Sequence, residues 1–152
     1  MNAAPAELEA YLHEHIPLSR AMQVSVVEAG VDGVLLRAPL APNINHRETV
    51  FGGSASAVAI LAAWSLLHLR LRAEGLASRL VIQRNSMEYL HAITSDFSAR
   101  ASSATGSEWQ RFVEALRRKG RARTCASARL FVDDDVAARL SGEFVAIDVD
   151  KR

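Results

Sequence analysis

The sequence predicts a single α+β domain in which a curved antiparallel sheet wraps around one long apolar helix. Residues 54–72 have helical length, and their apolar side chains occupy nearly all sides rather than one stripe. Segments in which apolar and polar residues alternate lie on both sides of this helix. The 152 residues, of which 49% are apolar, fit one domain spanning residues 1–152. One sheet covers only part of such a helix, so a second subunit is expected to cover more of it.

The first elements are a helix and a hairpin. Leu8, Leu12 and Ile16 recur at helical spacing, and Pro17 marks the end of that helix. Two strands are then expected at residues 22–29 and 34–40, joined by a turn at residues 30–33. A polar loop follows, and the long helix after it ends near residue 75.

Four further strands are expected after the long helix, because apolar and polar residues alternate again. Their predicted ranges are residues 79–93, 96–104, 122–133 and 143–149. A short helix interrupts the series, and Ser107 and Gln110 have the spacing of a capping box at its start. Trp109, Phe112 and Leu116 share one face of this helix and predict its buried side.

The composition limits the classes of partner and compartment. The formal net charge is +1, so no overall attraction to nucleic acid or to an anionic membrane is expected, and neither is predicted as a partner. Cys125 has no second cysteine to pair with and suits a reducing compartment. The N-terminal residues do not resemble a secretory signal, and the uncharged segment 50–69 is too polar for a spanning helix. We therefore expect a cytoplasmic protein.

The polar loop at residues 43–51 runs into Gly52 and Gly53 where the long helix begins. Backbone N–H groups at a helix start have no intrahelical partner and lie at the positive end of the helix dipole. Glycine has no side chain to shield them, so a carbonyl or phosphate oxygen can approach. This pattern predicts a site for an acyl carbonyl, with the Gly53 amide as the donor to the oxyanion. The alternative is a structural helix start in which the glycines only let the loop turn.

The order of elements, with two glycines opening the wrapped helix, resembles the hot-dog fold of acyl-CoA thioesterases and dehydratases. Residues 86–101 look like the strand-turn-strand that follows the helix in that superfamily. More narrowly, the chain is similar to the YiiD C-terminal family of thioesterase domains. The similar segments are residues 15–19 (HIPLS), 38–45 (APLAPNIN), 51–54 (FGGS) and 61–64 (LAAW). The resemblance covers nearly the whole chain and implies a reaction class rather than a substrate.

The resemblance also implies site residues. Many hot-dog thioesterases have an asparagine seven residues before the first glycine of a His-Gly-Gly motif, and Asn45 stands seven residues before Gly52. Phe51 replaces the histidine of that motif. Ile60 stands eight residues after the first glycine, where a catalytic Asp or Glu is often found, and the helix has no acidic residue until Glu74. Either the base comes from elsewhere, or the protein binds acyl thioesters without fast hydrolysis.

The loop offers other candidate groups, each of which has an ordinary structural alternative. Asn45 can orient water or hold the carbonyl, or it is a turn residue. His46 is a residue type that exchanges a proton near neutral pH, and Glu48 is a loop carboxylate that could replace the missing helical one. Ser54 is expected to be a first-turn residue rather than a nucleophile. The residues predicted to contact the substrate here are Phe51, Gly52 and Ser54.

A basic run at residues 117–123 has two interpretations. It is a solvated segment that favours the C-terminus of the preceding helix, or it binds the phosphates of coenzyme A or an acidic acyl carrier protein. The basic residues predicted to bind are Arg117, Arg118, Lys119 and Arg121. The strand residues predicted to lie along the pantetheine arm are Arg84, Asn85 and Ser86. No metal-ligand spacing occurs, so we expect no metal and no cofactor besides the coenzyme A or phosphopantetheine of the substrate.

These residues favour a homo-oligomer, either a dimer or a dimer of dimers, that hydrolyses an acyl-CoA or acyl-carrier-protein thioester. A hot-dog dehydratase is disfavoured because His46 has no acidic partner on the helix. The rival from another class is a non-catalytic module that binds or senses acyl thioesters, which Ile60 supports. A third alternative is an interaction domain without an acyl ligand.

Overall fold

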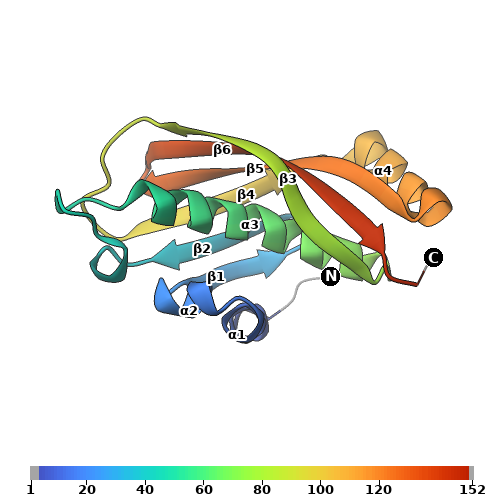
Figure 1. The fold of residues 1–152 in the computed structure, drawn as a ribbon, viewed down its shortest axis with the longest axis horizontal. Coiled ribbons are helices and arrows are strands. Elements are labelled where there is room, and N and C mark those ends of the chain that lie inside the picture. Colours follow the sequence, from blue (N-terminus) through green and yellow to red (C-terminus); the bar gives the residue numbers. More distant parts are fainter. Residues whose placement is uncertain (1–3, 151–152) are drawn as a thin grey trace.

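A computed structural model describes residues 4–150 and confirms the predicted α+β architecture. The helices are α1 (Pro5–His15), α2 (Pro17–Ala21), η1 (Ala41–Asn43, a 3-10 turn), α3 (Gly52–Ala73) and α4 (Gly106–Lys119). The strands are β1 (Ser25–Gly30), β2 (Gly33–Ala38), β3 (Ser78–Tyr89), β4 (Phe97–Ser103), β5 (Arg121–Val132) and β6 (Asp135–Asp148). They form one antiparallel sheet in the order β1-β2-β4-β5-β6-β3, which curves around α3 (Figure 1).

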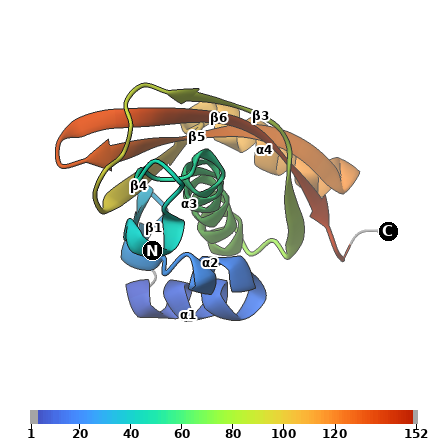
Figure 2. The same cartoon turned by 60° about the vertical axis from the view of Figure 1, so that its left-hand side comes forward.

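The core lies between α3 and the concave face of the sheet. Val58, Leu66 and Leu67 of α3 are almost fully buried there, which explains why the helix is apolar on nearly all sides. The helices α1 and α2 lie on the side of α3 away from the sheet (Figure 2), and Tyr11 of α1 stacks on His68 of α3. By length and composition α3 could cross a bilayer, but 56% of that apolar window is buried within the fold. A core helix has these same properties.

One edge of the sheet is long and exposed. β3 pairs with β6 through Ser78–Tyr89, with a bulge between Ile82 and Arg84, and its other side has no strand partner among residues 4–150. Val81 is 54% exposed on this strand and Tyr89 is 56% exposed. An edge of this length, unprotected by a covering element, is a template for pairing with a further strand.

Several predicted boundaries are wrong. β6 begins at Asp135, eight residues before the predicted start, because small residues such as Ala138 and Gly142 weaken the alternation while pairing on both sides holds the strand. β3 ends at Tyr89 rather than at residue 93. The capping box is also wrong. Thr105 is the N-cap of α4 without a side-chain cap bond, and Gly106, with φ of 58°, turns the chain into the helix.

The C-terminal end of α3 is joined to α4 by a network of side chains. Trp109 is buried, as predicted, with 4% of its surface exposed. Its ring centroid lies 3.9 Å from the Arg70 guanidinium carbon. Its indole N–H donates a hydrogen bond to Glu74 Oε1 at 3.1 Å, and Arg117 donates to the Glu74 carbonyl oxygen at 2.9 Å. This network occupies the polar groups at the C-terminal end of α3.

Candidate active site

A closed loop at residues 43–51 places the two glycines at the start of α3. Ile44 and Val50 form an antiparallel bridge, and the Phe51 N–H donates to the Asn43 carbonyl oxygen at 2.8 Å. The Asn43 side chain is buried, and its Nδ2 donates to two backbone carbonyls at 2.8 and 3.0 Å. Because both ends of the loop are fixed to the body of the protein, the start of α3 has a defined position.

Asn45 organises the interior of this loop. Its Oδ1 accepts hydrogen bonds from the backbone N–H groups of Arg47 (2.8 Å) and Thr49 (3.1 Å). Its Nδ2 donates to Thr49 Oγ1 at 2.9 Å, which leaves one of its two amide hydrogens unused. The residue is half-buried, as expected for a turn residue. The same geometry keeps the unused hydrogen available to a ligand.

The first turn of α3 presents free donors. Phe51 is the N-cap and makes no side-chain cap bond, so both glycines lie inside the helix, two residues earlier than predicted. Within residues 4–150 the amides of Gly52, Gly53 and Ser54 have no hydrogen-bond acceptor. The first amide of this turn that is bonded is that of Ala55, which donates to the Phe51 carbonyl at 3.0 Å. Three neighbouring N–H groups at the positive end of a helix form a site for a negatively charged oxygen.

The Phe51 ring explains why a glycine stands at position 53. A Cβ on Gly53 would lie 2.3 Å from Phe51 Cε2, so a side chain there would displace the ring. The Phe51 side chain is 57% exposed although it is large and apolar. The residue that replaces histidine in the motif therefore lies directly over the predicted oxyanion donor, where it can contact a bound acyl group.

Tyr89 belongs to this site and was not among the predicted residues. Its hydroxyl donates to the Gly52 carbonyl oxygen at 3.3 Å, and its ring lies 3.8 Å from where a Gly52 Cβ would be. The side chain is 56% exposed at the last position of β3. Sequence reasoning missed it because only the tertiary fold brings the end of β3 to the start of α3. An aromatic residue where the strand alternation stops was the available signal.

Groups that could accept a proton from water lie on the loop rather than on the helix. His46 and Glu48 are both exposed, and Glu48 has a φ of 65°, a left-handed conformation that is strained for a residue with a side chain. Ile60 is half-buried and packs against the core. Glu74, at the far end of α3, is engaged by Trp109. No carboxylate of α3 therefore faces this site.

The predicted strand residues do not share one surface. Arg84 and Ser86 lie opposite Glu143 and Ser141 of β6, on the outer face of the sheet. Asn85 is the neighbour between them and points to the other face, the face that α3 packs against. All three are exposed on the edge strand. Only Asn85 is on the side of the sheet that holds the glycines.

The basic segment lies at the other end of α3 from the glycines. Arg117, Arg118 and Lys119 occupy the last turn of α4, as the structural interpretation predicted, and Arg117 contacts Glu74. The 22 residues of α3 separate Glu74 from Gly52, a length of about 33 Å. Arg121 begins β5 next to this turn. Within one chain the structure does not bring the predicted phosphate-binding residues to the glycines.

Other titratable groups are not part of this site. His68 stacks on both Tyr11 and Trp64, with ring centroids 4.8 and 4.7 Å away. Burial, assisted by the nearby charge of Arg72 and by His15, lowers the pKa of His68 to about 4. Among residues 4–150 no group of three or more His, Cys, Asp or Glu side chains is placed to hold a metal ion. The groups available for chemistry at the glycines are therefore the side chains of the loop and the backbone amides of the helix.

A curved six-stranded sheet around a central helix that opens with free glycine amides is the arrangement of hot-dog thioesterase-type proteins. Residues 5–148 match the family model described as "Putative thioesterase (yiiD_Cterm)", and the chain belongs to this family. The resemblance inferred from the sequence motifs is therefore confirmed.

Solved structures agree with this fold. A Chlorobaculum tepidum protein of unknown function superimposes with a TM-score of 0.89 at 25% identity, covering 95% of this chain and 94% of that chain. A putative thioesterase from Shewanella oneidensis gives a TM-score of 0.84 at 25% identity, covering 94% and 96%. A probable thioesterase from Pseudomonas aeruginosa gives 0.80 at 18% identity, covering 95% and 97%. These similarities define the hot-dog fold of the protein.

Proposed function

We propose that this protein hydrolyses acyl thioesters of coenzyme A or of an acyl carrier protein, with the thioester carbonyl bound at the N-terminus of α3. The observation that carries the proposal is the set of unbonded amides at Gly52, Gly53 and Ser54. They lie beside an ordered loop that holds His46 and Glu48. Membership of a thioesterase family supports the same reaction class.

In the proposed reaction, the carbonyl oxygen accepts a hydrogen bond from the Gly53 N–H, which stabilises the negative charge that develops on it. Water attacks the carbonyl carbon and gives a proton to His46 or Glu48. The carbon–sulfur bond then breaks, and the sulfur of the leaving thiol takes up that proton. The unused amide hydrogen of Asn45 orients the water or the carbonyl.

We further propose that the functional form is a homo-oligomer built on the exposed edge of β3. Trp64 lies next to this edge, because its indole N–H donates to the Leu80 carbonyl at 2.8 Å. Antiparallel pairing of two copies of β3 would place Ser78 of one copy near Tyr89 of the other. The basic segment of one copy, near the C-terminal end of α3, would then approach the glycines of the second copy. In this arrangement the basic segment and the glycines, which are far apart within one chain, would lie close together across the interface.

The alternative is an acyl-thioester binding module without turnover. Ile60 favours it, because an apolar side chain that packs into the core replaces the helical carboxylate. Binding needs only the free amides and an apolar surface such as Phe51, whereas hydrolysis also needs a base. A measurement of turnover separates the two functions.

The experiment measures release of free thiol from short-, medium- and long-chain acyl-CoAs. Gly53→Pro removes the proposed donor, and Gly52→Pro removes a neighbouring amide as the matched control. Both substitutions are made in a Phe51→Ala background, because the proline ring would otherwise meet Phe51. Phe51 has a ψ of 132°, which is compatible with a proline at position 52. Circular dichroism establishes that each variant keeps its helices.

We expect Gly53→Pro to lower kcat by roughly 10²- to 10³-fold and Gly52→Pro to have a much smaller effect. Equal losses in both would show that the Gly53 amide is not the donor. Saturable acyl-CoA binding without turnover in the unmodified protein would support the binding module instead. If turnover occurs, His46→Gln and Glu48→Gln identify the base, since loss of the base should lower kcat far more than loss of the other side chain.

A further inference from the structure

The outer face of the sheet points away from α3 (Figure 2), and the strand registers show that it is rich in arginine. The strand registers place eight arginines of residues 4–150 on this surface, which we call the arginine face. They are Arg37, Arg79, Arg84, Arg100, Arg121, Arg123, Arg129 and Arg139. All are exposed. Since the whole chain has a formal net charge of only +1, the positive charge is concentrated on one side of the molecule.

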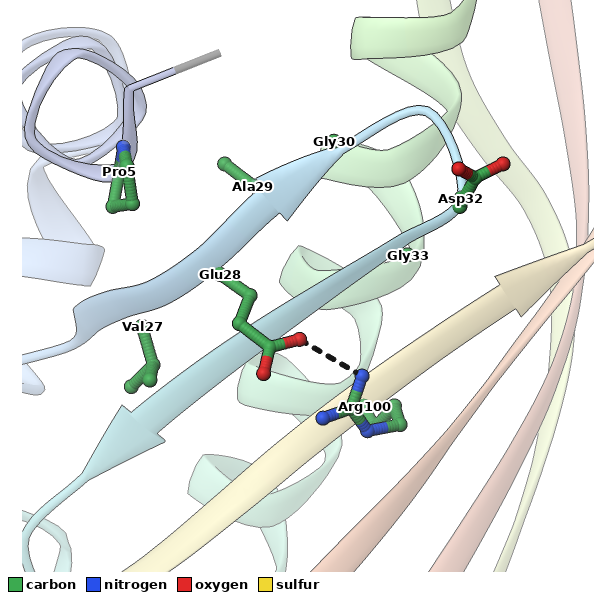
Figure 3. Close-up of a pocket in the computed structure, with 8 residues that line it drawn as sticks. All are labelled: Pro5, Val27, Glu28, Ala29, Gly30, Asp32, Gly33 and Arg100. Atoms are coloured by element: carbon green, nitrogen blue, oxygen red, sulfur yellow. Dashed lines mark hydrogen bonds and ion pairs between the residues drawn. The ribbon is translucent and has the colours of Figure 1, made fainter. Parts of the chain in front are cut away.

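One cross-strand row contains three arginines side by side. Arg129 of β5 lies directly opposite Arg100 of β4 on one side and Arg139 of β6 on the other. Glutamates of the edge strands draw the two outer arginines away from the centre. Arg100 pairs with Glu28 at 3.1 Å across β2 (Figure 3), and Arg139 pairs with Glu88 at 3.7 Å. Among residues 4–150, Arg129 in the centre has no ion pair.

The same face continues toward α4. Arg123 is opposite Val145, and Arg121 is opposite Ile147, which in turn faces Arg79 of β3. A surface cavity of about 360 Å³ is lined by Lys119, Arg121, Arg123 and Val145. The basic residues therefore surround small apolar areas, a mixture of arginine and aliphatic side chains that is typical of protein interfaces.

The central row reduces the stability of the isolated fold. Like charges directly opposite each other on neighbouring strands are destabilising, and no carboxylate of the described residues pairs with Arg129. A two-fold contact centred on this row does not compensate Arg129 either, because it would place arginines against arginines. A partner with the opposite charge removes the repulsion and gains charge-assisted hydrogen bonds.

We infer that the arginine face docks an acidic protein, and that this partner is the carrier protein that presents the thioester on a phosphopantetheine arm. The identification of the acidic partner as this carrier protein rests on the proposed hydrolase function. Each carboxylate on a folded partner can accept two parallel hydrogen bonds from the guanidinium group of one arginine. The central row, which runs through Glu88, Arg139, Arg129 and Arg100, has no aromatic side chain for stacking on bases or for anchoring in a bilayer.

The position of the row favours delivery to the glycines. Arg139 follows Ala138, which is the cross-strand partner of Tyr89, and the Tyr89 hydroxyl contacts Gly52. The β3 end of the central row is Glu88, the residue before Tyr89, so a phosphopantetheine arm on the outer face would pass around the end of β3 to reach the start of α3. An acidic turn at Asp133 and Asp134 bounds this end of the face. It would repel an extended polyanion and fix the orientation of a discrete partner.

Arg129→Glu tests the inference with a variant that should fold well, because the new carboxylate lies between Arg100 and Arg139. Arg20→Glu on α2 makes the same charge change away from the face, at an exposed residue. The substrates are an octanoyl group on an acidic acyl carrier protein and octanoyl-CoA. We expect Arg129→Glu to lower kcat/KM for the carrier thioester about tenfold, with a loss that shrinks at high salt. Octanoyl-CoA hydrolysis and the Arg20→Glu control should be unchanged.

Equal losses on both substrates, or no loss on the carrier thioester, would overturn the inference. If neither substrate is hydrolysed, the hydrolase proposal fails, and docking is tested by fluorescence anisotropy of the labelled carrier protein. Saturable binding that Arg129→Glu weakens and Arg20→Glu does not would support the docking surface by itself. Binding to a DNA duplex or to anionic phosphatidylglycerol vesicles in preference to the carrier protein would refute it.

Discussion

The two ends of α3 are built in opposite ways. At the N-terminal end, three backbone amides have no acceptor among the described residues, and the large side chains Phe51 and Tyr89 are exposed. At the C-terminal end, Arg70, Glu74 and Trp109 form bonds to one another and close the helix. Both ends need partners for unsatisfied backbone groups. The protein supplies those partners at one end and leaves them to a ligand at the other.

The largest expected effect of a substitution is at the C-terminal end of α3, which we call the closed end. Trp109→Ala removes a buried ring, its hydrogen bond to Glu74 and its contact with Arg70, so the free energy of unfolding should fall by about 3–5 kcal/mol. Urea denaturation followed by circular dichroism measures this loss. The kcat per folded molecule should stay the same, because the ring packs at the opposite end of α3 from the glycines. A large loss of kcat without a loss of stability would contradict the division between the two ends.

The next largest expected effect is at the N-terminal end of α3, which we call the open end. Gly53→Ala keeps the amide but forces Phe51 from its position over the helix start, which should lower kcat/KM roughly 10- to 100-fold. Stability should change little, since alanine is a better helix former than glycine. The double variant Phe51→Ala/Gly53→Ala should have the same kcat/KM as Phe51→Ala alone. A further loss in the double variant would assign the effect to the glycine rather than to the displaced ring.

The pH dependence of stability probes the aromatic stack near the closed end. The pKa of His68 is lowered to about 4 in the folded state, so between pH 6.5 and 4 the unfolded chain binds a proton that the folded protein does not. The contribution of neutral His68 to the free energy of unfolding is therefore fully present above pH 6.5. It is lost as the pH falls from 6.5 to 4, and below pH 4 the effect of His68 on stability no longer changes. The full shift corresponds to about 3 kcal/mol, and the partial exposure of the ring reduces the expected loss to about 1–2 kcal/mol.

Chemical denaturation at pH 7 and pH 4.5 measures this contribution of His68. His68→Gln should remove the corresponding part of the pH dependence, whereas His46→Gln, on the exposed loop, should leave it intact. An unchanged pH dependence in His68→Gln would assign the acid sensitivity to other groups.

The smallest effect concerns the link between β3 and the open end. Tyr89→Phe removes the hydroxyl that donates to the Gly52 carbonyl at 3.3 Å, a long and exposed bond worth about 0.5 kcal/mol. We expect a two- to threefold fall in kcat/KM and no measurable change in stability. Steady-state kinetics with the preferred acyl-CoA checks this. An effect of 100-fold or more would mean that the hydroxyl contacts the substrate itself.

The positions of the candidate residues were only partly predictable. The loop with Asn45, His46 and Glu48, the glycine pair and the apolar Ile60 position follow from local sequence, because helix starts and loops have local signatures. Tyr89 and the cross-strand row around Arg129 do not, since strand register and long-range contacts decide which residues meet. The position of the basic segment at the end of a helix was predictable from local sequence, but the sequence did not indicate that it lies at the far end of α3.

The sequence by itself determined the class of fold and the central helix, because hydrophobic periodicity and length dictate which elements can bury one another. Tertiary structure decided which side chains share a surface. It separated Asn85 from Arg84 and Ser86, brought Tyr89 to Gly52 and gathered the arginines on one face of the sheet. The physical reason is that neighbours in a sheet are set by pairing between distant segments, which no local pattern in the chain encodes.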